Sequence, residues 1–182
     1  IQSISRPGLG GIGDVTLFDL LRAALRQRPD FIIVGEVRGA EAYTLFQAIS
    51  TGHAGLSSIH ADSVPAVFHR LVSDPMNIPR TLIPAVNYIL LQARVTVKDR
   101  PVRRILSTTE VLGIDTRTNE FITNEVYRYR MEDDSFQFVG RSYIIEKIAK
   151  MKGLSVDEVN AELRNRALVL DWMVQKNIRR YR

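Results

Sequence analysis

A chain of 182 residues, of which 45% are hydrophobic and 25% charged, has the composition of one folded domain or of one domain with a small appendage. It contains no cysteine, which excludes disulfides and metal sites built on thiolates. No apolar run is long enough to span a bilayer, and no signal-peptide pattern opens the chain. The net charge of +5 lies entirely in the second half, because residues 1–90 contain seven basic and seven acidic side chains.

The first 75 residues alternate between helical and strand patterns, which is typical of an α/β sheet with crossover helices. A glycine-rich loop is expected over residues 7–14. Segment 31–34 is apolar at every position and bounded by turn residues, which predicts a strand buried on both faces, as in a parallel sheet. In chain order we expect a helix capped by Thr16 and stopped by Pro29, the strand at 31–34, a helix over 40–50 followed by Gly52, a strand over 56–60 and a helix over 65–72.

The second half is predicted to begin with antiparallel strands and to end with helices. Strand patterns cover residues 87–98, 102–114, 121–130 and 136–139, and short charged or acidic turns join them, which predicts a meander. A helix over 142–152 is expected to end at Gly153. Ser155 and Glu158 then form a capping box that opens a last helix, which reaches residue 175.

Polar side chains follow both strands of the expected parallel sheet. Glu36 and Arg38 come directly after the first strand, His53 follows the next helix, and His60 ends the second strand. Ligands of open parallel sheets bind at the carboxyl ends of the strands, where helix N-termini favour anions. A carboxylate there is placed to accept a proton from water, and an imidazole to donate to a phosphoryl oxygen, so the pattern favours phosphoryl chemistry.

Each of these residues also has a structural alternative. Glu36 and Arg38 are spaced as an ordinary ion pair, His53 can stabilise the last carbonyls of the preceding helix, and His60 can be a hydrogen-bonded core residue. Spacing alone does not decide between these alternatives and catalysis. A metal site on His53, His60 and Asp62 is disfavoured, because the spacing matches no metal-ligand motif.

Two longer runs carry a family resemblance. The runs are LRAALRQRPDFIIVGEVRG at residues 21–39 and TGHAGLSSIHADS at residues 51–63. They resemble the Walker B region and the His box of the type II/type IV secretion ATPases, which are hexameric motors of pilus, secretion and archaellum machines. Residues 5–8, 110–115 and 142–143 are most similar to the archaeal secretion and archaellum branch.

The resemblance implies a role for each residue of the expected sheet edge. Glu36 corresponds to the Walker B glutamate that orients or deprotonates the attacking water, and His60 to the histidine on the γ-phosphate side. His53 supports His60, and Arg38 belongs to the site network or to a subunit contact. Gly35 stands where many other P-loop ATPases place an aspartate, so it is assigned to the nucleotide site without a metal-binding role. No metal ligand is assigned in this chain.

The resemblance also implies a fold and partners. Residues 1–86 are expected to form a partial RecA-like core, 87–140 a β-rich continuation and 141–182 a helical subdomain. The family implies ATP and Mg²⁺, a homo-hexamer, and an integral membrane platform protein as partner. It further implies a cytoplasmic protein that is peripheral at the inner face of the cell membrane, with no nucleic-acid partner.

One motif of the family is missing from the sequence. No GxxxxGK[ST] occurs, and the glycine-rich run at residues 8–14 lacks the lysine and hydroxyl residue that hold phosphates and Mg²⁺. Together with a first residue other than methionine, this predicts a C-terminal portion of the motor domain that is inactive alone. The alternatives are a non-catalytic assembly module and a RecA-like nucleic-acid motor that uses the basic half.

Overall fold

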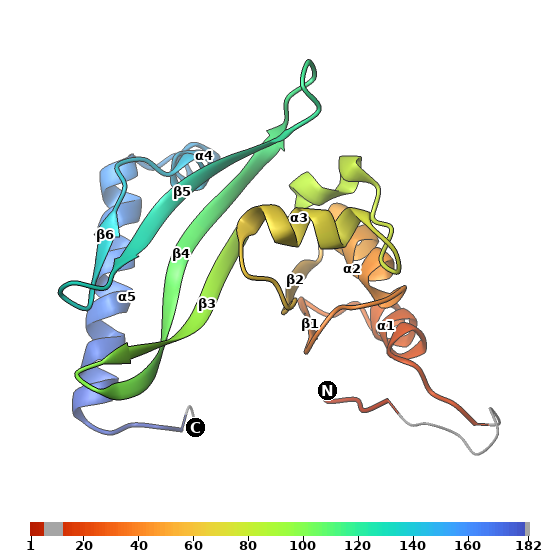
Figure 1. The fold of residues 1–182 in the computed structure, drawn as a ribbon, viewed down its shortest axis with the longest axis horizontal. Coiled ribbons are helices and arrows are strands. Elements are labelled where there is room, and N and C mark those ends of the chain that lie inside the picture. Colours follow the sequence, from red (N-terminus) through yellow and green to blue (C-terminus); the bar gives the residue numbers. More distant parts are fainter. Residues whose placement is uncertain (6–12, 181–182) are drawn as a thin grey trace. The chain divides into compact units, whose positions relative to one another are not determined.

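The computed structural model describes residues 1–5 and 13–180, so most of the expected loop over 7–14 lies outside the described residues (Figure 1). The chain forms two compact units, Ile1–Phe138 and Val139–Arg182. The first unit contains the region expected as 1–86 and nearly all of the region expected as 87–140. The three-part division therefore stays a prediction.

The first part of unit one has the alternation that the sequence predicts. Its elements are α1 (Leu17–Arg26), β1 (Phe31–Val34), α2 (Glu41–Ser50), β2 (Ala54–Ser57), α3 (Val64–Val72) and the unpredicted 3-10 helix η1 (Arg80–Ala85). Thr16 caps α1 in a reciprocal box, because its side chain accepts from the Asp19 backbone and the Asp19 carboxylate accepts from the Thr16 N–H. Gly52 follows α2 with a φ of 102°, a conformation in which a side chain would be strained.

β1 and β2 form a parallel two-stranded sheet in which Ile32 lies opposite Gly55 and Ile33 opposite Leu56. α2 packs on the face that carries Ile32 and Gly55. An added Cβ on Gly55 would lie 2.7 Å from Cγ1 of Ile49, so helix and strand approach too closely there for a larger residue. This close packing supports the buried core, in which Leu45 and Phe46 of α2 are central.

The expectation that β1 is buried on both faces is wrong. Ile32 is buried, whereas Phe31 and Ile33 are 64% and 73% exposed and Leu56 on the same face is 58% exposed. Among the described residues, helices cover only the Ile32 face of this sheet. An apolar strand shows that both of its faces suit burial, but whether a covering layer is present depends on what packs against it.

The rest of unit one is an antiparallel meander, as predicted. Its strands are β3 (Tyr88–Val97), β4 (Arg100–Ile114), β5 (Phe121–Arg130) and β6 (Ser135–Phe138), arranged in the order β3-β4-β5-β6. β3 and β4 are joined by a two-residue turn, shorter than expected, in which Lys98 and Asp99 have φ values of 48° and 59°. Positive φ at both central residues is the turn geometry that matches the twist of a hairpin.

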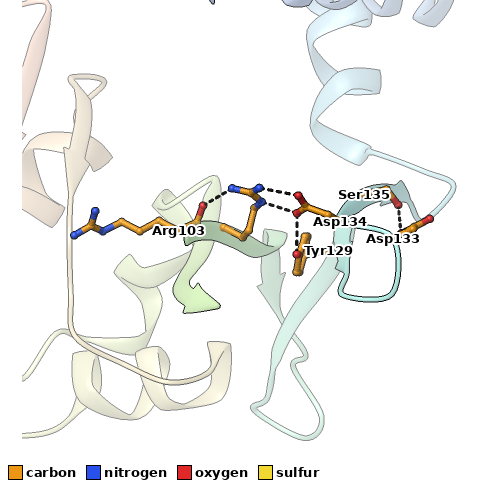
Figure 2. A network of polar contacts seen from close by, with 6 residues as sticks. Arg103, Tyr129, Asp133, Asp134 and Ser135 are labelled. Carbon is orange, nitrogen blue, oxygen red and sulfur yellow. Dashed lines mark hydrogen bonds and ion pairs between the residues drawn. The ribbon is translucent and has the colours of Figure 1, made fainter. Parts of the chain in front are cut away.

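A polar network holds the turn between β5 and β6 (Figure 2). The Arg104 guanidinium donates two hydrogen bonds to the Asp134 carboxylate, at 2.7 and 2.8 Å, and the Tyr129 hydroxyl donates a third at 2.9 Å. These bonds, led by that from Arg104, lower the pKa of Asp134 to about 2. Burial of the ring, followed by the nearby Asp134 carboxylate, raises the pKa of Tyr129.

Lowering the pH is therefore expected to weaken this turn only in strongly acidic solution. The pKa of Asp134 in the folded protein lies below the ordinary value of 3.8, so its ionised form stabilises the turn above that pH. The contribution is lost as the pH falls from 3.8 through about 2. We expect Arg104→Gln to move the Asp134 pKa up toward 3.8 in an NMR titration of its carboxyl carbon. Arg103→Gln is the control, because Arg103 enters the network through its backbone carbonyl; an unchanged pKa in Arg104→Gln would contradict the assignment.

Unit two is helical, with α4 (Tyr143–Lys152) and α5 (Val156–Gln175). Gly153 ends α4 in the left-handed conformation, and Ser155 and Glu158 form the predicted capping box of α5. Within the described ranges, no helix combines the length and apolar character that crossing a bilayer requires.

Candidate functional site

The parallel pairing of β1 and β2 brings the predicted Glu36 and His60 together. The register runs from Phe31–Ala54 to Val34–Ser57, so both strands end at the same edge of the sheet. Glu36 lies two residues beyond β1. β2 ends at Ser57 rather than at residue 60, so His60 lies in the loop after the strand. His60 Nε2 is 3.6 Å from Glu36 Oε1, so the two side chains lie together at this edge of the sheet.

The side chains of Glu36 and His60 are open to solvent and interact only weakly with each other. The side chain of His60 is 84% exposed and that of Glu36 is 32% exposed. A separation of 3.6 Å is longer than a hydrogen bond, and the two groups form an ion pair only when His60 is protonated. Glu36 is thus a carboxylate at an accessible strand end, where a water molecule can reach it.

The main chain on both sides of Glu36 is held by hydrogen bonds. The Ser58 hydroxyl donates to the Gly35 carbonyl at 2.6 Å, and the Val37 N–H donates to the Ser58 carbonyl at 3.0 Å. The Glu41 carboxylate accepts the N–H groups of Arg38 and Gly39 at 2.8 and 3.0 Å. Glu41 is buried at the start of α2, where an anion is stabilised by the helix N-terminus.

The loop that carries His60 is held from α3. Arg70 Nη1 donates to the His60 carbonyl at 2.6 Å. Three residues that hold the backbone of the site have no role in the sequence-based prediction: Ser58, although it lies in the matching run at residues 51–63, Glu41 and Arg70. An acidic residue in the first turn of a predicted helix was a usable signal for Glu41. No local signal exists for Ser58 and Arg70, because their partners lie 23 and 10 residues away.

The structure gives less support to the roles predicted for Gly35, Arg38 and His53. An added Cβ on Gly35 would meet nothing within 4 Å, so the backbone there is open to an approaching group. Arg38 is exposed, and its backbone N–H rather than its guanidinium contacts Glu41. Nδ1 of His53 lies 3.3 Å from the Ala48 carbonyl at the end of α2, as the structural alternative for His53 requires. The supporting role of His53 stays a proposal.

The described residues do not assemble a metal site. No group of three or more His, Cys, Asp or Glu side chains able to hold a metal ion occurs in residues 1–5 and 13–180. The donor set around Glu36 and His60 therefore does not fit Mg²⁺ by itself, and we assign no metal-dependent step to these residues.

A concave region of unit one lies away from this pair. A cavity of about 680 Å³ lies between α3 and the meander and includes neither Glu36 nor His60. Phe68 and Phe121 stack there at 4.3 Å, and the Arg80 guanidinium lies 4.3 Å above the Phe121 ring. These contacts join α3 and η1 to β5.

The sequence of this chain is similar to a known protein family and to several known proteins. Residues 2–168 match the family model described as type II/IV secretion system protein. An uncharacterised protein of Methanocaldococcus jannaschii is 49% identical over 168 residues, which are 92% of this chain and 62% of the relative. A putative conjugal transfer protein of Mycobacterium tuberculosis is 43% identical over 115 residues, 59% of this chain and 32% of the relative. The chain thus spans less than two thirds of the length of these relatives.

A solved structure is also similar to part of the chain. The ATPase DotB of Legionella pneumophila is 29% identical over a region that covers 53% of this chain and 27% of DotB, with a TM-score of 0.44. The match is too partial to place individual elements. The assignment to a family therefore rests on the family model, which covers residues 2–168.

Proposed function

Because residues 2–168 match its model, the chain belongs to the type II/IV secretion system protein family, and we propose that it forms the Walker B and His box portion of a secretion ATPase. The observation that carries this proposal is the pair formed by Glu36 and His60, 3.6 Å apart at the carboxyl edge of a parallel sheet. ATP is the proposed substrate. The protein expressed from its full reading frame is called the complete protein below.

In the proposed reaction, Glu36 acts on water. Its carboxylate orients the attacking water and accepts a proton as the water oxygen bonds to the γ-phosphorus. The bond from that phosphorus to the bridging oxygen of ADP breaks, which releases ADP and phosphate. His60, the more exposed of the two side chains, is proposed to donate a hydrogen bond to a γ-phosphate oxygen. His53, Arg38 and the open backbone at Gly35 are proposed to support this site.

Phosphate and Mg²⁺ binding are assigned mainly to residues outside this chain. The sequence holds no GxxxxGK[ST], and the described residues hold no metal-binding group of three or more ligands. We further propose that the complete protein is a cytoplasmic homo-hexamer that docks on an integral membrane platform protein. The similarity of residues 5–8, 110–115 and 142–143 to the archaeal secretion and archaellum branch supports that branch.

The experiment compares the 182-residue chain with the complete protein. We expect the complete protein to release phosphate from ATP in the presence of Mg²⁺. The chain alone is expected to bind ATP weakly and to release phosphate at the background rate, because it lacks the phosphate-binding lysine loop. Phosphate release and binding of a fluorescent ATP analogue are measured for both. Robust turnover by the chain alone, or none by the complete protein, would contradict the proposal.

A second candidate function is a non-catalytic assembly module. The favouring observation is α5, on which Leu168, Leu170 and Val174 are more than half exposed. This candidate predicts that the complete protein binds its machine normally but releases no phosphate. A nucleic-acid motor is disfavoured, because the basic residues of the second half are interspersed with acidic ones; salt-dependent DNA binding in an anisotropy assay would reverse that view.

A further inference from the structure

Glu36 lies in irregular backbone between β1 and α2, so secondary structure does not fix its position. Residues 35–40 belong to neither a strand nor a helix. A general base works only when its oxygen lies at the right distance and angle from the reacting water, and a displacement of about 1 Å can cost about 100-fold in rate. Something else must hold this backbone if Glu36 acts on water.

Ser58 makes the two hydrogen bonds that enclose Glu36 in the chain. Its hydroxyl binds the carbonyl of the residue before Glu36, at 2.6 Å, and its own carbonyl binds the N–H of the residue after, at 3.0 Å. The far side of the loop is held separately, since Glu41 accepts the N–H groups of Arg38 and Gly39. The Ser58 hydroxyl is therefore the side-chain contact nearest to the Glu36 peptide.

Ser58 also links the chain segments that carry the two site residues. It lies two residues before His60, whose carbonyl is fixed by Arg70 at 2.6 Å. The bonds from Ser58 to Gly35 and Val37 join the Glu36 segment to the His60 segment across the end of the sheet. Loss of the hydroxyl would leave one of these two links, so both the direction of Glu36 and its distance to His60 would become less defined.

We propose that Ser58 is a positioning residue that holds Glu36 for attack on the γ-phosphate, an inference that rests on the proposed ATPase function. Ser58 acts through the Gly35–Val37 backbone and makes no contact with the reacting atoms. Its effect is therefore expected on turnover rather than on nucleotide binding.

The test uses three variants of the complete protein. Ser58→Ala removes the hydroxyl, and Ser58→Thr keeps a hydroxyl on the same β-carbon. Ser57→Ala is the matched control: it removes the neighbouring exposed hydroxyl, which donates to the Ser58 carbonyl at 3.3 Å, and it keeps the bond from the Ser58 hydroxyl to Gly35 that Ser58→Ala removes. We expect Ser58→Ala to lower kcat about 10-fold with an unchanged nucleotide Kd, while Ser58→Thr and Ser57→Ala stay within about 2-fold of the unchanged protein.

A second measurement reports on the backbone without using activity. Amide hydrogen exchange of Val37 in the 182-residue chain is expected to be faster in Ser58→Ala than in Ser58→Thr or Ser57→Ala. Unchanged kcat in Ser58→Ala, or an equal loss of kcat in Ser58→Thr, would overturn the proposal while leaving the ATPase function standing. If the complete protein hydrolyses no ATP at all, the proposed function fails. If the exchange rate of the Val37 amide is also unchanged in Ser58→Ala, then Ser58 does not fix the backbone around Glu36.

Discussion

Replacing Glu36 by glutamine in the complete protein is expected to lower ATP hydrolysis by at least about 100-fold. The amide keeps the size and hydrogen-bonding reach of the side chain but cannot accept a proton from the attacking water. Because Glu36 lies at the sheet edge and is not part of a phosphate-binding loop, the Kd for nucleotide is expected to stay within about 2-fold. Phosphate release and equilibrium binding of a fluorescent ATP analogue measure the two quantities.

The control for this variant is Glu132→Gln, which removes a carboxylate from the exposed turn after β5. It is expected to retain the turnover of the unchanged protein. A Glu36→Gln protein with normal turnover would remove Glu36 from the reaction. A Glu36→Gln protein that no longer binds nucleotide would instead assign Glu36 to binding or folding.

Truncating Leu45 to alanine is expected to have the largest effect on stability. Leu45 is 2% exposed in α2, at the centre of the core against the Ile32 face of the sheet. Removing its buried methyl groups leaves a cavity and is expected to cost about 2–5 kcal/mol of unfolding free energy. Urea denaturation of the 182-residue chain, followed by circular dichroism, measures the change.

The matched control is Leu56→Ala, on the opposite face of the same sheet. Leu56 is 58% exposed, so the same truncation is expected to cost less than about 1 kcal/mol in the 182-residue chain. Equal losses for the two variants would show that the Phe31–Ile33–Leu56 face is covered in solution. A small loss for Leu45→Ala would contradict the described core.

Local signals in the sequence were sufficient to predict most of the elements. The capping residue Thr16, the Ser155–Glu158 box and Gly153 locate three helix ends, because each satisfies backbone groups within a few residues of itself. The alternation of strands and helices predicted the parallel pairing and the edge where Glu36 and His60 meet. The family resemblance then gave these two residues proposed roles that spacing alone left open.

The contacts between segments distant in sequence were decided by the tertiary structure. The bond from Ser58 to Gly35 depends on how the segments after β2 and β1 lie side by side, and the bond from Arg70 to His60 depends on how α3 lies against the loop after β2. The exposure of Phe31 and Ile33 has the same origin, because residue type tells which faces suit burial and only packing tells which face is covered. The composition and net charge of the whole sequence indicate only a folded chain with an excess of basic residues. The 3.6 Å approach of His60 to Glu36 was decided only when the two strands paired.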